Sequence, residues 1–417
     1  MFKLPKGFKD LLPDEAEVFY FVQQKLYESF LAFGYKPIIT SSVEFLKTYI
    51  LSGEEESHVF NFIDHYENKT ACFRFDFTPQ IVRIISSHKD FHQNLPIRIC
   101  YFGSVLRNPA NFFANPREIH HAGVELIGIE DIKAEQEILL LINEIAKNLN
   151  LKKEIKMYFN DNEILRKLLN KSGLYKNLEL KQAMIYRDIS KIEKIVSPLN
   201  VDKSIKRFII ELPLLCGDKK LLKDIQRKYP IPLIMPNINK LIQLSEFINS
   251  TFNNKIYFDL GEVRGLEYHT GIVFDGYLED NSGKMKEIIT GGRYNKLLKQ
   301  FGINNTSATG FAIDIISLSN CIHLPKNLEV ALVTGNSDMN TLIKIAQFLQ
   351  NSKIRVTLLT KMKKEELQKN RFDYILILED NINLSIIDCK NKETKKLALD
   401  KFFKSFLQEF FDYKGKE

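Results

Sequence analysis

Residues 96–129 read PIRICYFGSVLRNPANFFANPREIHHAGVELIGI, and this stretch decides the fold. Residues 96–107 and 119–129 are rich in branched apolar and aromatic side chains, as β-strands are, and a polar loop separates them. A strand, a loop and a returning strand predict an antiparallel hairpin with a long tip.

The returning strand carries polar side chains within an apolar run. Because side chains alternate between the two faces of a strand, His121, Gly123 and Glu125 share one face. The glycine leaves open space between the imidazole and the carboxylate. A buried carboxylate without a partner is costly, so Glu125 either forms a salt bridge or faces a wet cavity. Arg107 ends the first strand on the face of Tyr101, where it could form a structural ion pair or belong to a site.

Two further segments carry polar side chains that could share one pocket. In CFRFDFT, residues 72–78, three phenylalanines are predicted to face the core, while Asp76 and Thr78 face solvent or a binding surface. The segment RGLEYHTGIVF, residues 264–274, begins with a cation, an anion, a phenol and an imidazole ahead of an apolar end. Carboxylates, guanidiniums, a phenol and imidazoles together suit a small zwitterion. A free amino acid is the expected ligand.

The composition is that of a globular protein, with 44% hydrophobic and 27% charged residues among 417. The length predicts two or three domains, and the formal net charge of +7 is interpreted as modest and dispersed. Lys-rich pieces such as residues 361–369 are predicted to be solvated helix faces rather than a nucleic-acid stripe. No apolar run approaches the roughly 20 residues of a membrane span, and the first residues resemble no secretory signal.

The five cysteines lie far apart in the sequence and form no C-x-x-C pair. We therefore expect no disulfide framework, no metal site and a reducing, cytoplasmic location. The sequence contains no Walker loop and no G-x-G-x-x-G motif, so no cofactor is expected.

The pattern along the chain changes several times. Residues 14–34 and 133–149 carry helical periodicity, strand character returns at 255–276, and from residue 328 strands alternate with a helix. The expected domains are a core in two parts (1–150 and 253–324), a helical insertion (151–252) and a C-terminal α/β domain (328–417).

Several motifs resemble one known family when they are taken as a set. RGLEYHTGIVF and GGRYNKLL (residues 291–298) resemble the two histidine-binding signatures of histidyl-tRNA synthetase, a class II aminoacyl-tRNA synthetase. The hairpin from Arg107 to Glu125 resembles class II motif 2, and GFAIDI (Gly310–Ile315) occupies the place of motif 3. The resemblance implies an α+β fold with an antiparallel sheet of six or seven strands flanked by helices. It also implies a helical insertion, a small C-terminal α/β domain and dimerisation through the N-terminal region.

Two branches of this family share the pattern: the true synthetases and a non-charging paralogue, the regulatory subunit of ATP phosphoribosyltransferase. Pro109 stands where a synthetase has the Glu that holds adenine, and Asn115 where it has a second motif 2 Arg. Ile316 and Ser317 stand where motif 3 should end in Glu-Arg. Adenylation needs cations on the triphosphate, and one missing donor can cost about 2.7–4 kcal/mol. These departures favour the regulatory branch, which the segments FDFTPQIVR and YHTGIVF also resemble.

The same resemblance implies a histidine-binding set and no catalytic residue. The implied set is Asp76, Thr78, Arg107, His121, Glu125, Arg264, Tyr268, His269 and Tyr294. His121 replaces the usual Gln and His269 replaces a second tyrosine; if both imidazoles are charged, they would repel the ligand's ammonium group. Ser41 stands where the motif 1 proline is expected at the dimer interface.

The expected function is therefore that of a regulatory subunit, with L-histidine as effector and a short-form catalytic subunit as partner. The implied assembly is a homodimer within a hetero-oligomer. A diverged, active histidyl-tRNA synthetase is the chief alternative. An RNA-binding paralogue is a third possibility, but the acidic residues Asp373, Glu379 and Asp380 of the C-terminal domain disfavour it, and tRNA is not an expected partner.

Overall fold

The computed structural model describes residues 3–88, 90–91, 94–108, 116–251, 255–263, 269–324, 328–334, 339–359 and 372–409. These residues belong to two compact units, unit 1 (Met1–His323) and unit 2 (Leu324–Glu417). Among the described helices, none has the length and apolar character that crossing a membrane would require.

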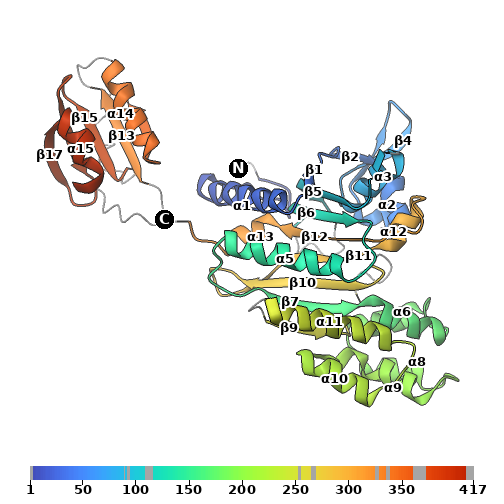
Figure 1. Ribbon diagram of the computed structural model, residues 1–417. Coiled ribbons are helices and arrows are strands. Elements are labelled where there is room, and N and C mark those ends of the chain that lie inside the picture. Colours follow the sequence, from blue (N-terminus) through green and yellow to red (C-terminus); the bar gives the residue numbers. More distant parts are fainter. Residues whose placement is uncertain are drawn as a thin grey trace. The chain divides into compact units, whose positions relative to one another are not determined.

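A sheet of nine described strands forms the centre of unit 1 (Figure 1). In spatial order the strands are β1 (Lys36–Pro37), β5 (Ile97–Leu106), β6 (Glu118–Ile127), β12 (Ala308–Asp314), β11 (Met285–Arg293), β10 (Ile272–Glu279), β7 (Lys156–Asp161), β9 (Ile256–Asp259) and β8 (Cys216–Gly217). The run from β5 to β7 is antiparallel throughout, which confirms the predicted sheet. The short strands β1, β9 and β8 at its two edges bring the number above the predicted six or seven. Strand β1 pairs in parallel with β5, and β9 pairs in parallel with β7.

The predicted hairpin is confirmed as β5 and β6, which pair from Ile97 with Ile127 to Leu106 with Glu118. Its tip, residues 109–115, falls outside the part of the chain that the structure describes. The two strands occupy neighbouring positions inside the sheet, with β12 on the other side of β6.

Helices cover this sheet and extend beyond it. The α-helices of unit 1 are α1 (Pro13–Ala32), α2 (Leu46–Ser52), α3 (Thr78–Ser87), α5 (Lys133–Asn148), α6 (Asn162–Lys171), α7 (Leu178–Ile185), α8 (Ile189–Val196), α9 (Lys203–Glu211), α10 (Lys219–Lys228), α11 (Met235–Thr251), α12 (Asn295–Gln300) and α13 (Ile315–Ser319). The 3-10 helices are η1 (Glu56–His58) and η2 (Leu212–Leu214). Figure 1 shows α1, α5 and α13 packed together along the sheet. Helix α1, in the segment predicted to be helical, buries Val22, Leu26 and Phe30. The positive φ of +79° at Gly34 allows the chain to turn just after it.

The alternation predicted for residues 72–78 holds over only part of that segment in the structure, because the strand there is short. It ends at Phe73 as β4 (Lys69–Phe73), the middle strand of a small sheet with β2 (Val43–Phe45) and β3 (Asn61–Asp64). Phe73 is 42% exposed, so its predicted place in the core is wrong, whereas Phe75 and Phe77 are buried. The physical reason is that the chain crosses between sheets: the Arg74 carbonyl accepts a hydrogen bond from the Leu106 N–H of β5 (2.8 Å).

The segment predicted as a helical insertion contains α6 to α11 and also two strands of the main sheet, β7 and the short β8. Its helical part, residues 162–251, carries 17 lysines and arginines against nine acidic residues, a formal net charge of +8. The whole chain carries only +7. The prediction of a dispersed charge is therefore wrong, because the positive charge is concentrated in these helices.

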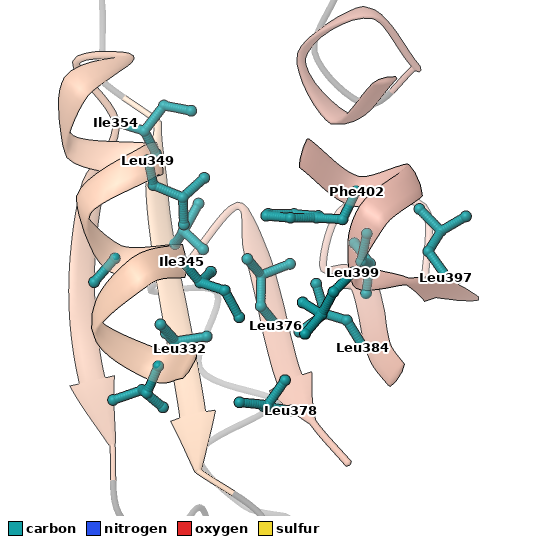
Figure 2. Packing of buried hydrophobic residues seen from close by; sticks show 14 residues of the cluster. Leu332, Ile345, Leu349, Ile354, Leu376, Leu378, Leu384, Leu397, Leu399 and Phe402 are labelled. Atoms are coloured by element: carbon teal, nitrogen blue, oxygen red, sulfur yellow. The ribbon is translucent and has the colours of Figure 1, made fainter. Parts of the chain in front are cut away.

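Unit 2 is an α/β domain in which five described strands form a mixed sheet. In spatial order they are β14 (Arg355–Leu359), β13 (Glu329–Thr334), β15 (Tyr374–Leu378), β16 (Asn383–Asp388) and β17 (Glu393–Ala398). The described helices are α14 (Met339–Asn351) and α15 (Leu399–Glu409). Figure 2 shows how Ile345 and Leu349 of α14 and Phe402 of α15 pack with Leu332, Leu376 and Leu384 of the strands in one apolar core.

Candidate functional site

A cavity of about 280 Å³ opens on the main sheet of unit 1. Its lining contains seven of the nine residues predicted to bind the ligand: Asp76, Thr78, Arg107, His121, Glu125, His269 and Tyr294. The other two, Arg264 and Tyr268, belong to residues 264–268, which the structure does not describe. This volume is just below the roughly 300–1,000 Å³ typical of ligand pockets, as expected for a small ligand.

Cross-strand register brings these residues together. In β6, Gly123 lies opposite Tyr101 of β5, and Glu125 lies opposite Gly310 of β12. A Cβ atom on Gly310 would lie 2.0 Å from Glu125 Oε2, and one on Gly123 would lie 2.3 Å from the Tyr101 ring. Both positions therefore require glycine, but the space above Gly123 is filled by the Tyr101 ring and is not open as predicted.

Glu125 is the most enclosed carboxyl group of the cavity, with 1% of its surface exposed. It accepts a hydrogen bond from Thr78 Oγ1 (2.6 Å) on one oxygen and from the Tyr294 hydroxyl (2.5 Å) on the other. Burial raises the pKa of Glu125 to about 8 although both hydrogen bonds lower it, and the neighbouring Asp76 raises it further. No described cation forms an ion pair with Glu125, so the geometry favours the cavity interpretation over the salt bridge.

Arg107 and Asp76 form the charged side of the cavity. Burial raises the pKa of Asp76, and the nearby Arg107 guanidinium opposes that rise. Arg107 also stacks over the Phe75 ring, with its Cζ atom 5.2 Å from the ring centre. Its Nε atom is buried without a hydrogen-bond partner among the described residues, so the guanidinium retains a donor for an anionic group.

The two histidines are neutral rather than charged. Burial lowers the pKa of His121 to about 3, and the charges of Arg107 and Arg74 lower it further. Burial also lowers the pKa of His269 to about 4. The predicted repulsion of an ammonium group is therefore removed. The buried His121 Nδ1 atom makes no hydrogen bond within the described part of the chain, so it can bond to a ligand.

Sequence reasoning missed several residues of the cavity lining: Glu54, Tyr101, Glu287, Thr290, Gly291, Gly292, Gly310, Phe311 and Ala312. Tyr101 shares a strand face with Arg107, so its period-two spacing could have identified it. Glu54 follows α2 and has no such signal; burial raises its pKa, and the charge of Asp76 adds to the rise. With Glu287 included, the described lining contains four carboxyl groups and one guanidinium.

The motif 3 position lies where β12 continues into α13. Ile316 and Ser317 form the first turn of this helix, and Asp314 caps it by accepting hydrogen bonds from both backbone N–H groups (3.0 and 3.2 Å). The Ser317 hydroxyl also donates to Asp314 (2.6 Å). Neither residue lines the cavity. Within the described residues, no cluster of His, Cys, Asp and Glu side chains could hold a metal ion.

The antiparallel sheet, its flanking helices and its polar cavity agree with the class II aminoacyl-tRNA synthetase fold, which the comparison with solved structures shows. The crystal structure of an ATP phosphoribosyltransferase regulatory subunit/histidyl-tRNA synthetase from Bacillus halodurans C superposes with a TM-score of 0.76. The match covers 90% of this chain and 98% of that one at 22% sequence identity.

The family model of histidyl-tRNA synthetase matches residues 7–318, and the chain belongs to this family. An ATP phosphoribosyltransferase regulatory subunit from Syntrophotalea carbinolica is 31% identical over 79% of this chain and 76% of the relative. A histidine–tRNA ligase from Sulfurisphaera tokodaii is 30% identical over 74% of this chain and 72% of the relative. The comparisons thus include both branches of the family.

Proposed function

We propose that the chain is a non-catalytic regulatory subunit of ATP phosphoribosyltransferase, the enzyme that joins ATP to phosphoribosyl pyrophosphate in the first step of histidine biosynthesis. The observation that carries the proposal is the cavity, in which an acidic wall, one arginine and two neutral imidazoles face a space of about 280 Å³. Relatives with the regulatory name match most of this chain, which supports the same assignment.

L-Histidine fits the chemistry of this cavity. Asp76 and Glu125 can accept the ligand's ammonium group, and Arg107 can hold its carboxylate with two parallel hydrogen bonds. The neutral His121 and His269 can hydrogen-bond the ligand without adding positive charge. By resemblance, Arg264 and Tyr268 complete the set, with Arg264 in a binding role.

Electrostatics argue against adenylation as the function of the site. The described lining would present four carboxyl groups and a single guanidinium to a triphosphate, so it offers only one cation to stabilise that anion. The motif 3 position carries Ile316 and Ser317, which bring no positive charge. Pro109 and Asn115 occupy two other ATP-binding positions by resemblance. We therefore assign ligand binding without activation.

Regulation requires that histidine bind one state of the assembly better than another, since equal affinity shifts no equilibrium. The proposed assembly is a homodimer of this chain within a hetero-oligomer with a short-form catalytic subunit. The proposed location is the cytoplasm, with which the five free cysteines agree.

An active histidyl-tRNA synthetase is the second candidate, and the histidine–tRNA ligase relative favours it. It requires cations from outside the described lining to replace those missing near the cavity.

The test combines purified short-form catalytic subunit with this chain and measures phosphoribosyl transfer with and without histidine. The proposal predicts that the chain changes the transferase activity and that histidine alters it only when the chain is present. Absence of histidine binding by calorimetry, or an unchanged transferase activity, contradicts the proposal.

A further inference from the structure

The positive charge of the molecule is concentrated in the helices of residues 162–251. The formal charge there is +8, whereas residues 1–161 carry 18 basic and 22 acidic residues, a formal charge of −4. A basic segment attached to an acidic core indicates a surface that attracts an anionic partner.

Helices α10 and α11 form a groove within this basic segment. Its volume is about 390 Å³, and its lining residues are Lys223, Gln226, Arg227, Asn239, Ile242 and Gln243. Gln226 and Asn239 join the two helices through a hydrogen bond of 2.7 Å. No carboxylate lines the groove, so it presents two cations and several amide donors.

Lys223 and Arg227 lie one turn apart on α10, and both are exposed. No ion pair joins either of them to a described acid, unlike Lys228 and Arg207, which both pair with Glu211. Their charges are therefore available to a partner. The guanidinium of Arg227 matches a carboxylate in a bidentate pair.

Separate hydrogen bonds join α11 to α6 and α6 to the ligand cavity. On α11, Asn237 donates to Asp161, the residue that caps α6 (2.7 Å), and accepts from Lys167 of α6 (2.7 Å). Also on α6, Arg166 donates a hydrogen bond to the backbone carbonyl of His269 in the cavity (2.6 Å). The position of α11 is thus coupled to the cavity wall.

We infer that the α10–α11 groove and its basic rim are the docking surface for an acidic protein partner. This inference rests on the proposed function, under which the partner is the catalytic subunit. The hydrogen bonds through α6 give the docked partner a physical link to the histidine cavity.

The surface favours a protein over RNA. Single-stranded RNA is recognised by aromatic side chains that stack on bases, and no aromatic side chain lines the groove. Tyr229, at the end of α10, is 1% exposed and unavailable for stacking.

The experiment uses the full chain with the double substitution Lys223→Glu and Arg227→Glu. Its binding to purified short-form catalytic subunit is measured at low and high salt. We expect the double substitution to weaken the complex by at least about tenfold, and the wild-type complex to weaken as salt rises. Histidine affinity and the thermal midpoint should stay unchanged, since both side chains are exposed and distant from the cavity lining. The control is Lys344→Glu with Lys353→Glu in unit 2, which changes the net charge equally and should leave the complex intact.

The outcomes separate the docking surface from the proposed function. If the wild type binds the catalytic subunit and both double variants bind equally well, the docking surface is wrong and the proposed function stands. If the wild type binds histidine but no catalytic subunit, both fail. Binding of tRNA that depends on Lys223 and Arg227, with no binding of the catalytic subunit, would assign the groove to nucleic acid instead.

Discussion

The ligand cavity lies along β12, and the first turn of α13 follows the end of the same strand. The cavity is lined by several ionisable side chains, whereas this first turn carries none. At Gly310 the strand passes under Glu125, whose hydrogen bonds to Thr78 and Tyr294 define an enclosed polar wall. A few residues later, Ile316 and Ser317 begin a helix with no charged side chain at the place where the family's motif 3 has Glu-Arg. Under the proposed function, this sheet keeps the recognition of an amino acid and lacks the binding of a triphosphate.

The largest expected effect comes from removing the carboxyl group of Glu125, which is proposed to bind the ligand's ammonium group. Glu125→Gln keeps the shape but loses the bond to the ligand's ammonium group, worth about 1.5–3 kcal/mol or roughly 10- to 150-fold in affinity. Calorimetry with histidine measures the loss. Unchanged affinity in both Glu125→Gln and Arg107→Ala would remove the pocket assignment.

The same Glu125→Gln variant should be more stable than the wild type when no ligand is present. The folded-state pKa of Glu125 is raised to about 8, so the stability of the wild type declines as the pH rises from the ordinary value of 4.5 toward 8. The glutamine amide does not titrate, so the variant does not lose stability in this way. The difference in thermal midpoint between Glu125→Gln and the wild type should therefore grow as the pH rises from 4.5 to 8. A gain that shrinks as the pH rises would contradict the buried, protonated state of Glu125.

A smaller steric change tests the glycine under the carboxylate. Gly310→Ala places a Cβ atom 2.0 Å from Glu125 Oε2 and 2.4 Å from the Val124 carbonyl, so either the strand or the carboxylate must move. We expect a destabilisation of about 1–3 kcal/mol together with weaker histidine binding. Gly217→Ala in β8 is the matched control, because its Cβ would approach only Leu221, at 3.4 Å. Equal behaviour of the two variants in thermal melts would contradict the close packing.

The dependence on pH should distinguish the cavity from an ordinary exposed carboxylate site. Below pH 8 the empty cavity holds a proton on Glu125, which must leave before the carboxylate can bind an ammonium group. Histidine affinity should therefore rise between pH 7 and 8, by up to about tenfold per unit. Calorimetry in two buffers of different ionisation enthalpy measures the proton released, and Glu125→Gln should abolish that release. A flat profile in the wild type would show that Glu125 is ionised without ligand.

The smallest expected effect lies outside the cavity. Arg166 holds the His269 carbonyl from α6, so Arg166→Ala should weaken histidine binding by a few-fold, since such a bond contributes about 1 kcal/mol. Asn237→Ala removes the hydrogen bonds from α11 to Asp161 and Lys167 and should have a similar or smaller effect on histidine binding. Affinities equal to the wild type in both variants would remove the link between the insertion and the cavity.

Residue periodicity predicted the part of the site that regular strands build. The alternation along 119–129 placed His121 and Glu125 on one face, and the structure brings both into the cavity. It failed where the chain leaves regular structure: residues 74–77 cross between sheets, so Phe73 is exposed and Asp76 reaches the cavity from a loop. Glu54 joins the site only through tertiary packing, which no local pattern records.

The charge of the insertion was overlooked for a different reason. A whole-chain total of +7 averages an acidic core with a basic helical segment, and the charge of the predicted insertion was not counted separately. The protonation states of His121 and His269 likewise depend on burial, which the sequence does not record.

The most direct test of the central claim is histidine-dependent exchange of pyrophosphate into ATP by the purified chain, with histidine binding measured by calorimetry on the same sample. The account predicts binding without exchange, because the acid-rich cavity holds an amino acid and cannot activate it. Exchange above background would mean that cations from elsewhere in the chain replace the missing ones. The protein would then be a synthetase, and the regulatory assignment would be wrong.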